Sequence, residues 1–375
     1  MRKLLLALCL LAPLPLAAQQ IYCDKPAELT DGWTFAEPTQ VGFDAKLCGI
    51  DKFLEQWPER NIHAVVVIRR GKLVMERYYS GNDERWGSPL GRVVYTPEQM
   101  HDLRSVSKSV TSMLVGIAVG EGKFPALDSS AIDFFPALAS SVRTAANARI
   151  TFRHMLTMSS GLAWDESIPY SNPANSERRL IASDDPLRHF FTQPFAAPPG
   201  EIYNYNGGNT HTLGMSLAKA ISREVPAYAR EKLFEPLEFG LSDWVAMPTN
   251  GQTAFASGLR LRPRDTAKLG QIMLTDGVWK GRQVLPKGWA AESTKPRING
   301  AGIYFYGYQW WLGRNLHRGR EITWFAGFGC GGQRLFVVPE LDLVVTINAG
   351  HYGGPLQGII TSAIFTDHIL TSIKD

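Results

Sequence analysis

The chain has 375 residues, of which 45% are hydrophobic and 20% are charged, and this composition excludes a disordered or low-complexity protein. The formal net charge is +4, but the positive residues are spread singly or in pairs, so we expect no nucleic-acid partner. The eight histidines lack metal-binding spacings such as H-x-H or H-E-x-x-H, so we expect no metal and no other cofactor.

The first residues have the layout of a secretory signal. Two positive residues precede an apolar run from Leu4 to Leu16, and small residues follow it. Pro13 and Pro15 interrupt the run, whereas a membrane-spanning helix needs about 20 unbroken apolar residues. We therefore expect a cleaved signal over residues 1–18, a periplasmic or secreted protein, and no membrane attachment of the mature form.

Three cysteines follow this segment, which is an odd number for an oxidising compartment. Cys23 and Cys48 are close in sequence, and their pairing would leave Cys330 free. Unpaired thiols at all three positions are an equally good interpretation of the sequence.

The first strand pattern is a β-hairpin. β-branched residues fill Ala64–Ile68, a glycine-containing turn follows over Arg69–Lys72, and a second strand runs from Leu73 to Tyr79. From Ser105 onward apolar residues recur at helical spacing, and glycines at positions 120 and 122 close that helix.

The middle of the chain reads as helical and the end as mixed. Residues from about 125 to 250 alternate short helices with loops, including a helix that Thr151 caps and that runs to Met158. Beyond about 255 come a helix, further strands, a hairpin over residues 333–348 and a final helix from about Leu356. Tyr306, Tyr308 and Trp310 alternate along one predicted strand, where we expect them to pack rather than bind a ligand.

This order predicts an α/β (α+β) fold in which one antiparallel sheet, flanked by helices, is assembled from both ends of the chain. We expect the sheet domain to comprise residues 21–125 and 255–375. The mostly helical inserted region is then residues 126–254.

One short motif suggests chemistry. Ser105 and Lys108 form an S-x-x-K pattern at a helix start, where the helix dipole and unpaired amides favour negative charge and the lysine lies one turn from the hydroxyl. The same spacing recurs at Ser216 and Lys219 inside a helix, where the hydroxyl is expected to bond the backbone. On these residues alone, a nucleophile with its base and a capping serine beside a solvated lysine are equal interpretations.

Five blocks in order resemble the serine β-lactamase-related family, which includes class C β-lactamases, D-alanyl-D-alanine peptidases, esterases and 6-aminohexanoate-dimer hydrolases. The blocks are the hairpin at Val65–Tyr79, Arg104–Ser109, Ile150–Leu162, Pro199–Asn206, and Gly331–Gln333 leading into the final hairpin. The resemblance implies a β-lactamase/transpeptidase-like fold with Ser105 as nucleophile and Lys108 beside it.

The second family motif, Tyr-x-Asn, falls at Tyr205-Asn206-Gly207, after a Pro-Gly approach. The resemblance implies that Tyr205 handles the proton. Gly207 departs from the motif, and we expect Asn206 or Asn209 to supply the missing amide to the substrate. The literal match that begins at Tyr170 lacks this approach, so we interpret it as pocket wall or loop.

The third family motif, Lys-Thr-Gly or His-x-Gly, corresponds to Gly327-Phe328-Gly329, which has no cation. Because that cation helps to hold a substrate carboxylate in penicillin-recognising relatives, its loss makes efficient β-lactam turnover less expected. The backbone N–H groups of Ser105 and Cys330 are the implied oxyanion hole. The implied substrate contacts are Trp164, Tyr170, Asn206, Asn209, Phe328 and Gly329.

The sequence therefore predicts an exported serine hydrolase that cleaves ester or amide bonds of small substrates through an acyl-enzyme. Either Lys108 or Tyr205 is the general base, since both have free pKa values near about 10 and one must be lowered. The alternatives are a β-lactamase or D-alanyl-D-alanine carboxypeptidase, and a catalytically silent relative that binds peptidoglycan fragments or a protein. The expected partner is a small-molecule ester or amide, and the oligomeric state is not predicted.

Overall fold

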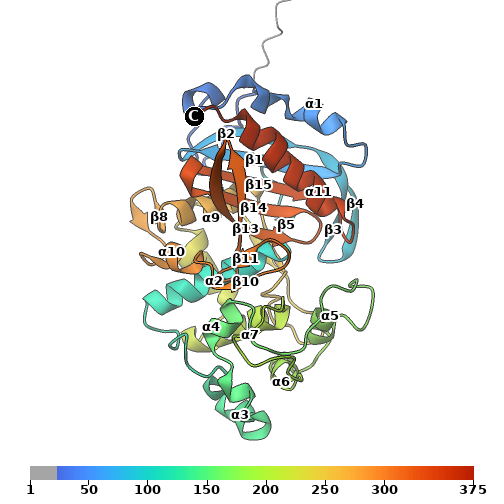
Figure 1. Ribbon diagram of the computed structural model, residues 1–375, viewed down its shortest axis with the longest axis vertical. Coiled ribbons are helices and arrows are strands. Elements are labelled where there is room, and N and C mark those ends of the chain that lie inside the picture. The colour runs from blue at the N-terminus through green and yellow to red at the C-terminus, as the bar shows by residue number, and fades with distance from the viewer. Residues whose placement is uncertain (1–22) are drawn as a thin grey trace, which may run out of the picture.

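The computed structural model describes residues 23–375, and the predicted signal at 1–18 lies outside them (Figure 1). Its main element is an eight-stranded sheet in the order β10-β11-β12-β13-β14-β15-β1-β2, with every neighbouring pair antiparallel. The strands are β1 (Ile62–Arg69), β2 (Lys72–Tyr78), β10 (Ile298–Asn299), β11 (Phe305–Tyr306), β12 (Trp311–His317), β13 (Arg320–Gly329), β14 (Gln333–Val338) and β15 (Leu343–Ala349). The predicted antiparallel sheet built from both ends of the chain is confirmed.

Three smaller sheets lie beside this one. They are β3 (Ser80–Arg85) with β4 (Ser88–Val94), the set β5 (His101–Asp102), β7 (Leu259–Leu261) and β6 (Ser242–Trp244), and β8 (Val278–Trp279) with β9 (Arg282–Gln283). The three-stranded sheet of β5, β7 and β6 fixes the start of helix α2 (Val106–Gly120), because β5 leads directly into that helix.

Some helices cover the sheet, and others form the stretch of chain that lies in sequence between its N-terminal and C-terminal strands. They are α1 (Ile50–Glu55), α2 (Val106–Gly120), α3 (Pro136–Val142), α4 (Phe152–Leu156), α5 (Ser176–Ile181), α6 (Pro186–Phe191), α7 (Gly207–Ile221), α8 (Val225–Ala229), α9 (Pro263–Leu274), α10 (Trp289–Ser293) and α11 (Leu356–Ala363). In Figure 1 the sheet with α1 and α11 lies in the upper part of the view and α3 to α7 lie in the lower part. The division into two domains stays a prediction.

Two layers of apolar side chains sandwich the sheet. Along β1, Val66 and Ile68 face a cluster that contains α2 and α9, while Val65 and Val67 face a second cluster that contains α1 and α11. Successive side chains of a strand point to opposite faces, so a strand covered on both faces is apolar throughout. The run of β-branched residues in β1 follows from this double burial.

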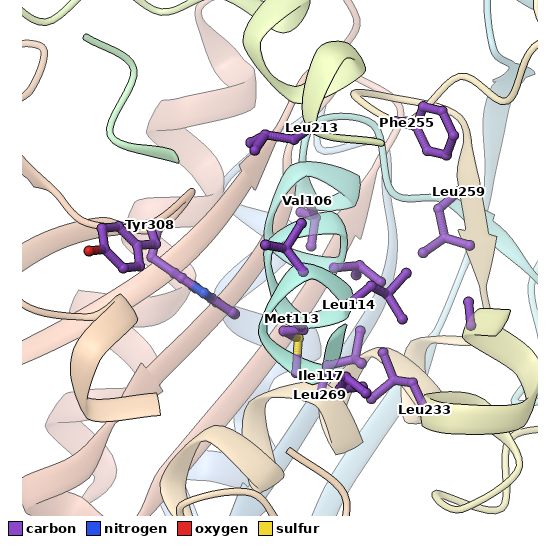
Figure 2. Close-up of a cluster of buried hydrophobic side chains, with 14 of the residues drawn as sticks. Val106, Met113, Leu114, Ile117, Leu213, Leu233, Phe255, Leu259, Leu269 and Tyr308 are labelled. Atoms are coloured by element: carbon purple, nitrogen blue, oxygen red, sulfur yellow. The ribbon is translucent and has the colours of Figure 1, made fainter. Parts of the chain in front are cut away.

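Helix α2 is buried over almost its whole length, from Val106 to Ala118. Figure 2 shows its apolar side chains among those of α7, β7 and α9, labelled Val106, Met113, Leu114, Ile117, Leu213, Leu259 and Leu269. Hydroxyls hold its other faces, because Ser109 Oγ donates to Gln309 O (2.7 Å) and Thr111 Oγ1 to Phe255 O (3.1 Å). A helix held on all sides gives a rigid base for groups at its start.

Some local predictions need correction. The helix capped by Thr151 ends at Leu156, because Met158 has a positive φ of 56° that takes the chain out of the helix. Tyr308 and Trp310 lie between β11 and β12 rather than on a strand, although both are fully buried as expected for packing.

Cys23 and Cys48 form a disulfide, and Cys330 is a free cysteine. The bridge ties the first described residues to the segment before α1. Within residues 23–375, no helix is both long and apolar enough to cross a bilayer.

Candidate active site

Ser105 stands at the N-cap of α2, but its hydroxyl makes no capping bond. Instead Ser105 Oγ accepts a hydrogen bond from Lys108 Nζ at 2.9 Å. Lys108 is only 1% exposed, and its ammonium also donates to Ala256 O at 3.1 Å. The lysine of the S-x-x-K motif is therefore a buried partner of the hydroxyl and not a solvated surface residue.

The backbone before the nucleophile is unusual. Arg104 has a positive φ of 49°, a conformation that only a small share of residues other than glycine adopt. Its side chain pairs with Glu84 and lies 3.3 Å from Asp102, and it covers the ring of Tyr352 at 4.8 Å. These contacts hold the turn that presents Ser105 at the helix start.

Tyr205 reaches the same place from the segment before α7. Lys108 Nζ lies 4.9 Å from the centroid of its ring, and the ring stacks on Trp311 at 5.6 Å. Burial and the nearby Glu166 carboxylate raise the pKa of Tyr205 well above its ordinary value, against a hydrogen bond with Ser105 that lowers it. The structure thus brings Ser105, Lys108 and Tyr205 together, with the tyrosine favoured as a neutral phenol.

The end of β13 lies against the segment that precedes Ser105. A Cβ atom on Gly329 would stand 2.4 Å from Leu103 O and 3.1 Å from Arg104 Cβ, which no side chain tolerates. Glycine at this position lets the strand approach closely, so that Cys330 follows beside Ser105 at the wall of one cleft. The backbone N–H groups of Ser105 and Cys330, expected from the resemblance to form an oxyanion hole, thus belong to residues that line the same cleft.

The cleft has a volume of about 620 Å³. Its lining residues come from six separate parts of the chain: Ser105, Trp164, Asp165, Glu166, Ser167, Tyr170, Asn204, Tyr205, Trp311, Phe328, Gly329, Cys330, Arg334 and Gln357. Trp164, Tyr170, Phe328 and Gly329 were expected here from the sequence.

Asn206 and Asn209 were also expected in the cleft, and this expectation is wrong. Asn206 is the N-cap of α7, where its side-chain oxygen accepts from Asn209 N at 3.1 Å. Both residues are fully buried beneath the cleft wall, and Asn209 Nδ2 contacts Met158 Sδ at 3.6 Å. The helix start requires a capping group, and this need places the two amides in the interior.

A carboxyl group occupies the space that the motif asparagine would take. A side chain at Gly207 would lie 3.0 Å from Glu166 Oε1 and 2.9 Å from the carboxyl of Glu177. Glu166 Oε1 accepts from Gly207 N and, at 2.5 Å, from Trp164 Nε1. Burial, and then the charge of Glu177, raise the pKa of Glu166 to about 8.

Glu166, Trp311 and Arg334 line the cleft but were not predicted from the sequence. A period-2 reading of the final hairpin would have found Arg334, because it pairs across from Phe328 in the register of β13 and β14, on the same face. Glu166 and Trp311 carry no such local signal, since both reach the cleft only through the packing of distant segments.

The second S-x-x-K match behaves as expected. Ser216 Oγ donates to Thr212 O at 2.7 Å within α7, and Ser216 is fully buried away from the cleft. Three other buried residues, His63, Asp83 and His101, lie close enough to hold a metal ion, a cluster that sequence spacing did not reveal. His63 Nδ1 and His101 Nε2 are 2.8 Å apart, which fits a direct hydrogen bond.

Comparisons with known proteins agree with this geometry. The β-lactamase family model matches residues 50–354, which is most of the chain. The chain therefore belongs to the β-lactamase family. A 6-aminohexanoate-dimer hydrolase of Paenarthrobacter ureafaciens is 26% identical over 339 residues, which cover 84% of this chain and 79% of that protein.

Solved structures of similar fold include a Bacillus anthracis protein with a TM-score of 0.70 and 19% identity, covering 95% of this chain and 92% of that one. Another is EstCE1, a hydrolase with promiscuous acyltransferase activity, with a TM-score of 0.63 and 18% identity. It covers 85% of this chain and 97% of EstCE1. The predicted β-lactamase/transpeptidase-like fold is confirmed.

One feature distinguishes this β-lactamase family chain from the motif of its penicillin-recognising relatives. The resemblance assigns the third-motif cation position to Gly327, and a Cβ there would lie 3.0 Å from Val106 Cγ1, so the strand packs directly on α2. The cleft nevertheless contains a cation, because Arg334 lines it from β14.

Proposed function

We propose that the chain is a serine hydrolase that cleaves ester or linear amide bonds of small substrates through an acyl-enzyme on Ser105. The observation that carries the proposal is the 2.9 Å contact between Lys108 Nζ and Ser105 Oγ, with Tyr205 against the same ammonium. A serine hydroxyl is a weak nucleophile until a base takes its proton, and this pair supplies one.

In the proposed cycle Lys108 Nζ acts as the base and takes the proton of Ser105 as Oγ attacks the carbonyl carbon. The developing oxyanion accepts hydrogen bonds from the N–H groups of Ser105 and Cys330. Tyr205, whose raised pKa favours the phenol, donates its proton to the leaving group and regains one from the Lys108 ammonium. Water then attacks the acyl-enzyme along the reverse proton path and releases the acid.

The choice of esters and linear amides over β-lactams rests on two observations. The third-motif position is Gly327, which has no charged side chain to hold a carboxylate close to the reacting bond. The similar proteins include a 6-aminohexanoate-dimer hydrolase and the hydrolase EstCE1. The first of these names gives a substrate that is not a β-lactam.

A fluorophosphonate probe tests the nucleophile. We expect labelling of the wild type and of Ser216→Ala, which removes the hydroxyl of the second S-x-x-K match, but none of Ser105→Ala. We expect hydrolysis of p-nitrophenyl butyrate to follow the same pattern. A folded wild type that takes no label would instead identify a silent, ligand-binding relative.

We also propose that the protein is exported and matures by cleavage after Ala18. The Cys23–Cys48 disulfide supports export, because structural disulfides persist mainly in oxidising compartments. Expression of the full chain in a bacterial host should yield a periplasmic or secreted protein whose first residue is Gln19 by N-terminal sequencing. A cytoplasmic product that keeps Met1 would refute this proposal.

A further inference from the structure

Arg334 is a buried cation at the edge of the cleft. It belongs to β14, is 8% exposed and lies over the ring of Phe328 at 4.7 Å. Its Nη1 donates to Gly329 O at 3.0 Å and to Gln333 O at 2.8 Å, and its Nη2 donates to Gln357 O at 2.8 Å. All of these acceptors are backbone carbonyls, so its charge is held in place without being neutralised.

Across residues 23–375, no carboxylate lies within 4.0 Å of this guanidinium, although most other buried cations here have one. Burial lowers the pKa of Arg334 to about 10. A buried charge without a counter-ion is unfavourable unless a ligand of opposite charge completes the site. Arg334 therefore has the properties expected of a binding group for an anionic ligand.

The cleft wall between the catalytic pair and Arg334 is aromatic. Tyr205 stacks on Trp311 at 5.6 Å, and Trp311 stacks on Phe328 at 5.8 Å with an interplanar angle of 21°. Lys108 lies over the first ring of this series and Arg334 over the last. All three rings line the cleft, so the surface from the reacting groups to the guanidinium is apolar.

We infer that Arg334 binds a carboxylate of the substrate, and that an apolar chain between this carboxylate and the bond under attack lies along Tyr205, Trp311 and Phe328. This inference rests on the proposed function and narrows its substrate to esters or amides of acids that carry a second, distant carboxylate. A guanidinium presents parallel N–H donors that match a carboxylate, and the stacked rings match methylene groups.

The geometry also explains a preference against β-lactams. The carboxylate of a bicyclic β-lactam lies only a few bonds from the reacting amide. Lys108 lies over the first of three successive aromatic rings and Arg334 over the last, so we expect a compact substrate to reach only one of these groups. A flexible aliphatic chain of several carbons can reach both.

The test compares two esters with the same six-carbon acyl chain, mono-p-nitrophenyl adipate and p-nitrophenyl hexanoate. They differ only in the terminal carboxylate. We expect wild-type kcat/KM to be higher for the adipate ester. In Arg334→Gln, the loss on the adipate ester should exceed the loss on the hexanoate ester by about 10- to 100-fold, the range for a hydrogen bond to a charged group. For Arg334→Lys we expect an intermediate loss of kcat/KM on the adipate ester, since lysine keeps the positive charge but lacks the pair of parallel N–H donors.

Arg282→Gln is the matched control, because it removes an exposed arginine of β9 and changes the net charge equally. It should leave both rates unchanged. Equal losses on both esters in Arg334→Gln would overturn the inference and assign Arg334 to holding the turn after β13 against α11.

A measurement on the wild type keeps the test independent of variant folding. Hexanoate should inhibit hydrolysis of p-nitrophenyl hexanoate at least about tenfold more strongly than hexanamide, which lacks the charge. Equal inhibition, or no preference for the adipate ester in an enzyme that takes the fluorophosphonate label, would refute the role of Arg334 alone. Failure of the wild type to take the label would refute the proposed function itself.

Discussion

At the scale of single residues, the site combines groups whose charges depend on one another. Lys108 contacts Ser105 Oγ and the ring of Tyr205, while the carboxyl groups of Glu166 and Glu177 lie near Gly207. Placing Glu166 beside a second carboxyl favours its protonated form.

The raised pKa of Glu166 predicts a pH dependence of stability. The unfolded chain releases this proton near pH 4.5 and the folded chain near pH 8, so the folded state holds one more proton between these values. Its contribution is complete below about pH 4.5 and is lost as the pH rises through about 8. Urea unfolding of the wild type should therefore show a free energy that falls between pH 5 and pH 8 more steeply than that of Glu166→Gln.

Glutamine is a suitable replacement because its side-chain oxygen still accepts from Gly207 N and Trp164 Nε1. Glu201→Gln, which removes an exposed carboxyl, serves as the control and should keep the wild-type slope. Parallel curves for the wild type and Glu166→Gln would contradict the prediction.

At the scale of elements, the site depends on the contact between the end of β13 and the turn before α2. This contact is made by backbone against backbone, with Gly329 opposite Leu103 O. The two proposed oxyanion donors, at Ser105 and Cys330, belong to these two elements. Their separation is therefore set by how closely the strand approaches the helix.

Gly329→Ala tests this dependence. Its methyl group would meet Leu103 O at 2.4 Å, and since backbone on both sides cannot move freely, we expect a loss of about 1–3 kcal/mol in unfolding free energy. Hydrolysis of p-nitrophenyl butyrate by the folded variant should also fall, because the donors move apart. Gly358→Ala on α11, where an added Cβ meets nothing within 4 Å, should retain wild-type hydrolysis. Full activity in Gly329→Ala would contradict the prediction, because it would show that the two N–H donors do not depend on the close approach of β13 to the turn before α2.

At the scale of the whole molecule, one buried ionic group joins three parts of the chain. Arg264 of α9 is fully buried and donates to both carboxylate oxygens of Glu76 on β2, at 2.7 and 2.9 Å. It also donates to Asp31 Oδ2 at 3.0 Å and to Ala27 O at 2.6 Å. The first described residues are fastened in this way to the face of the sheet that α9 covers.

Arg264→Met should destabilise the protein strongly. The substitution leaves Glu76 and Asp31 buried without a cation, which typically costs about 3–5 kcal/mol. Arg143→Met removes an exposed arginine paired with Asp133 and should change the urea midpoint far less. Equal midpoints for the two variants would show that water or rearrangement satisfies the carboxylates.

How much the sequence predicts depends on how local each signal is. The hairpin of β1 and β2 was predictable because a glycine-containing turn joins strands of β-branched residues. The structure has positive φ at both turn residues, Arg70 and Gly71. The start of α2 and the Ser105–Lys108 pair were predictable for the same reason, since helical spacing brings residues three apart together.

Sequence periodicity by itself determined the antiparallel sheet and the helix that carries Ser105, because it acts over a few residues. Lys108 and Tyr205 were expected beside Ser105 because of the family resemblance. Only the tertiary structure decided which polar groups share the cleft. Asn206 turned inward to cap α7, Glu166 took the space beside Gly207, and Arg334 came to the far end of the aromatic wall. The contact of Glu166 with Gly207 joins residues 41 apart, and the aromatic wall joins Tyr205 to Trp311, so packing between separate segments decides which groups meet in the cleft.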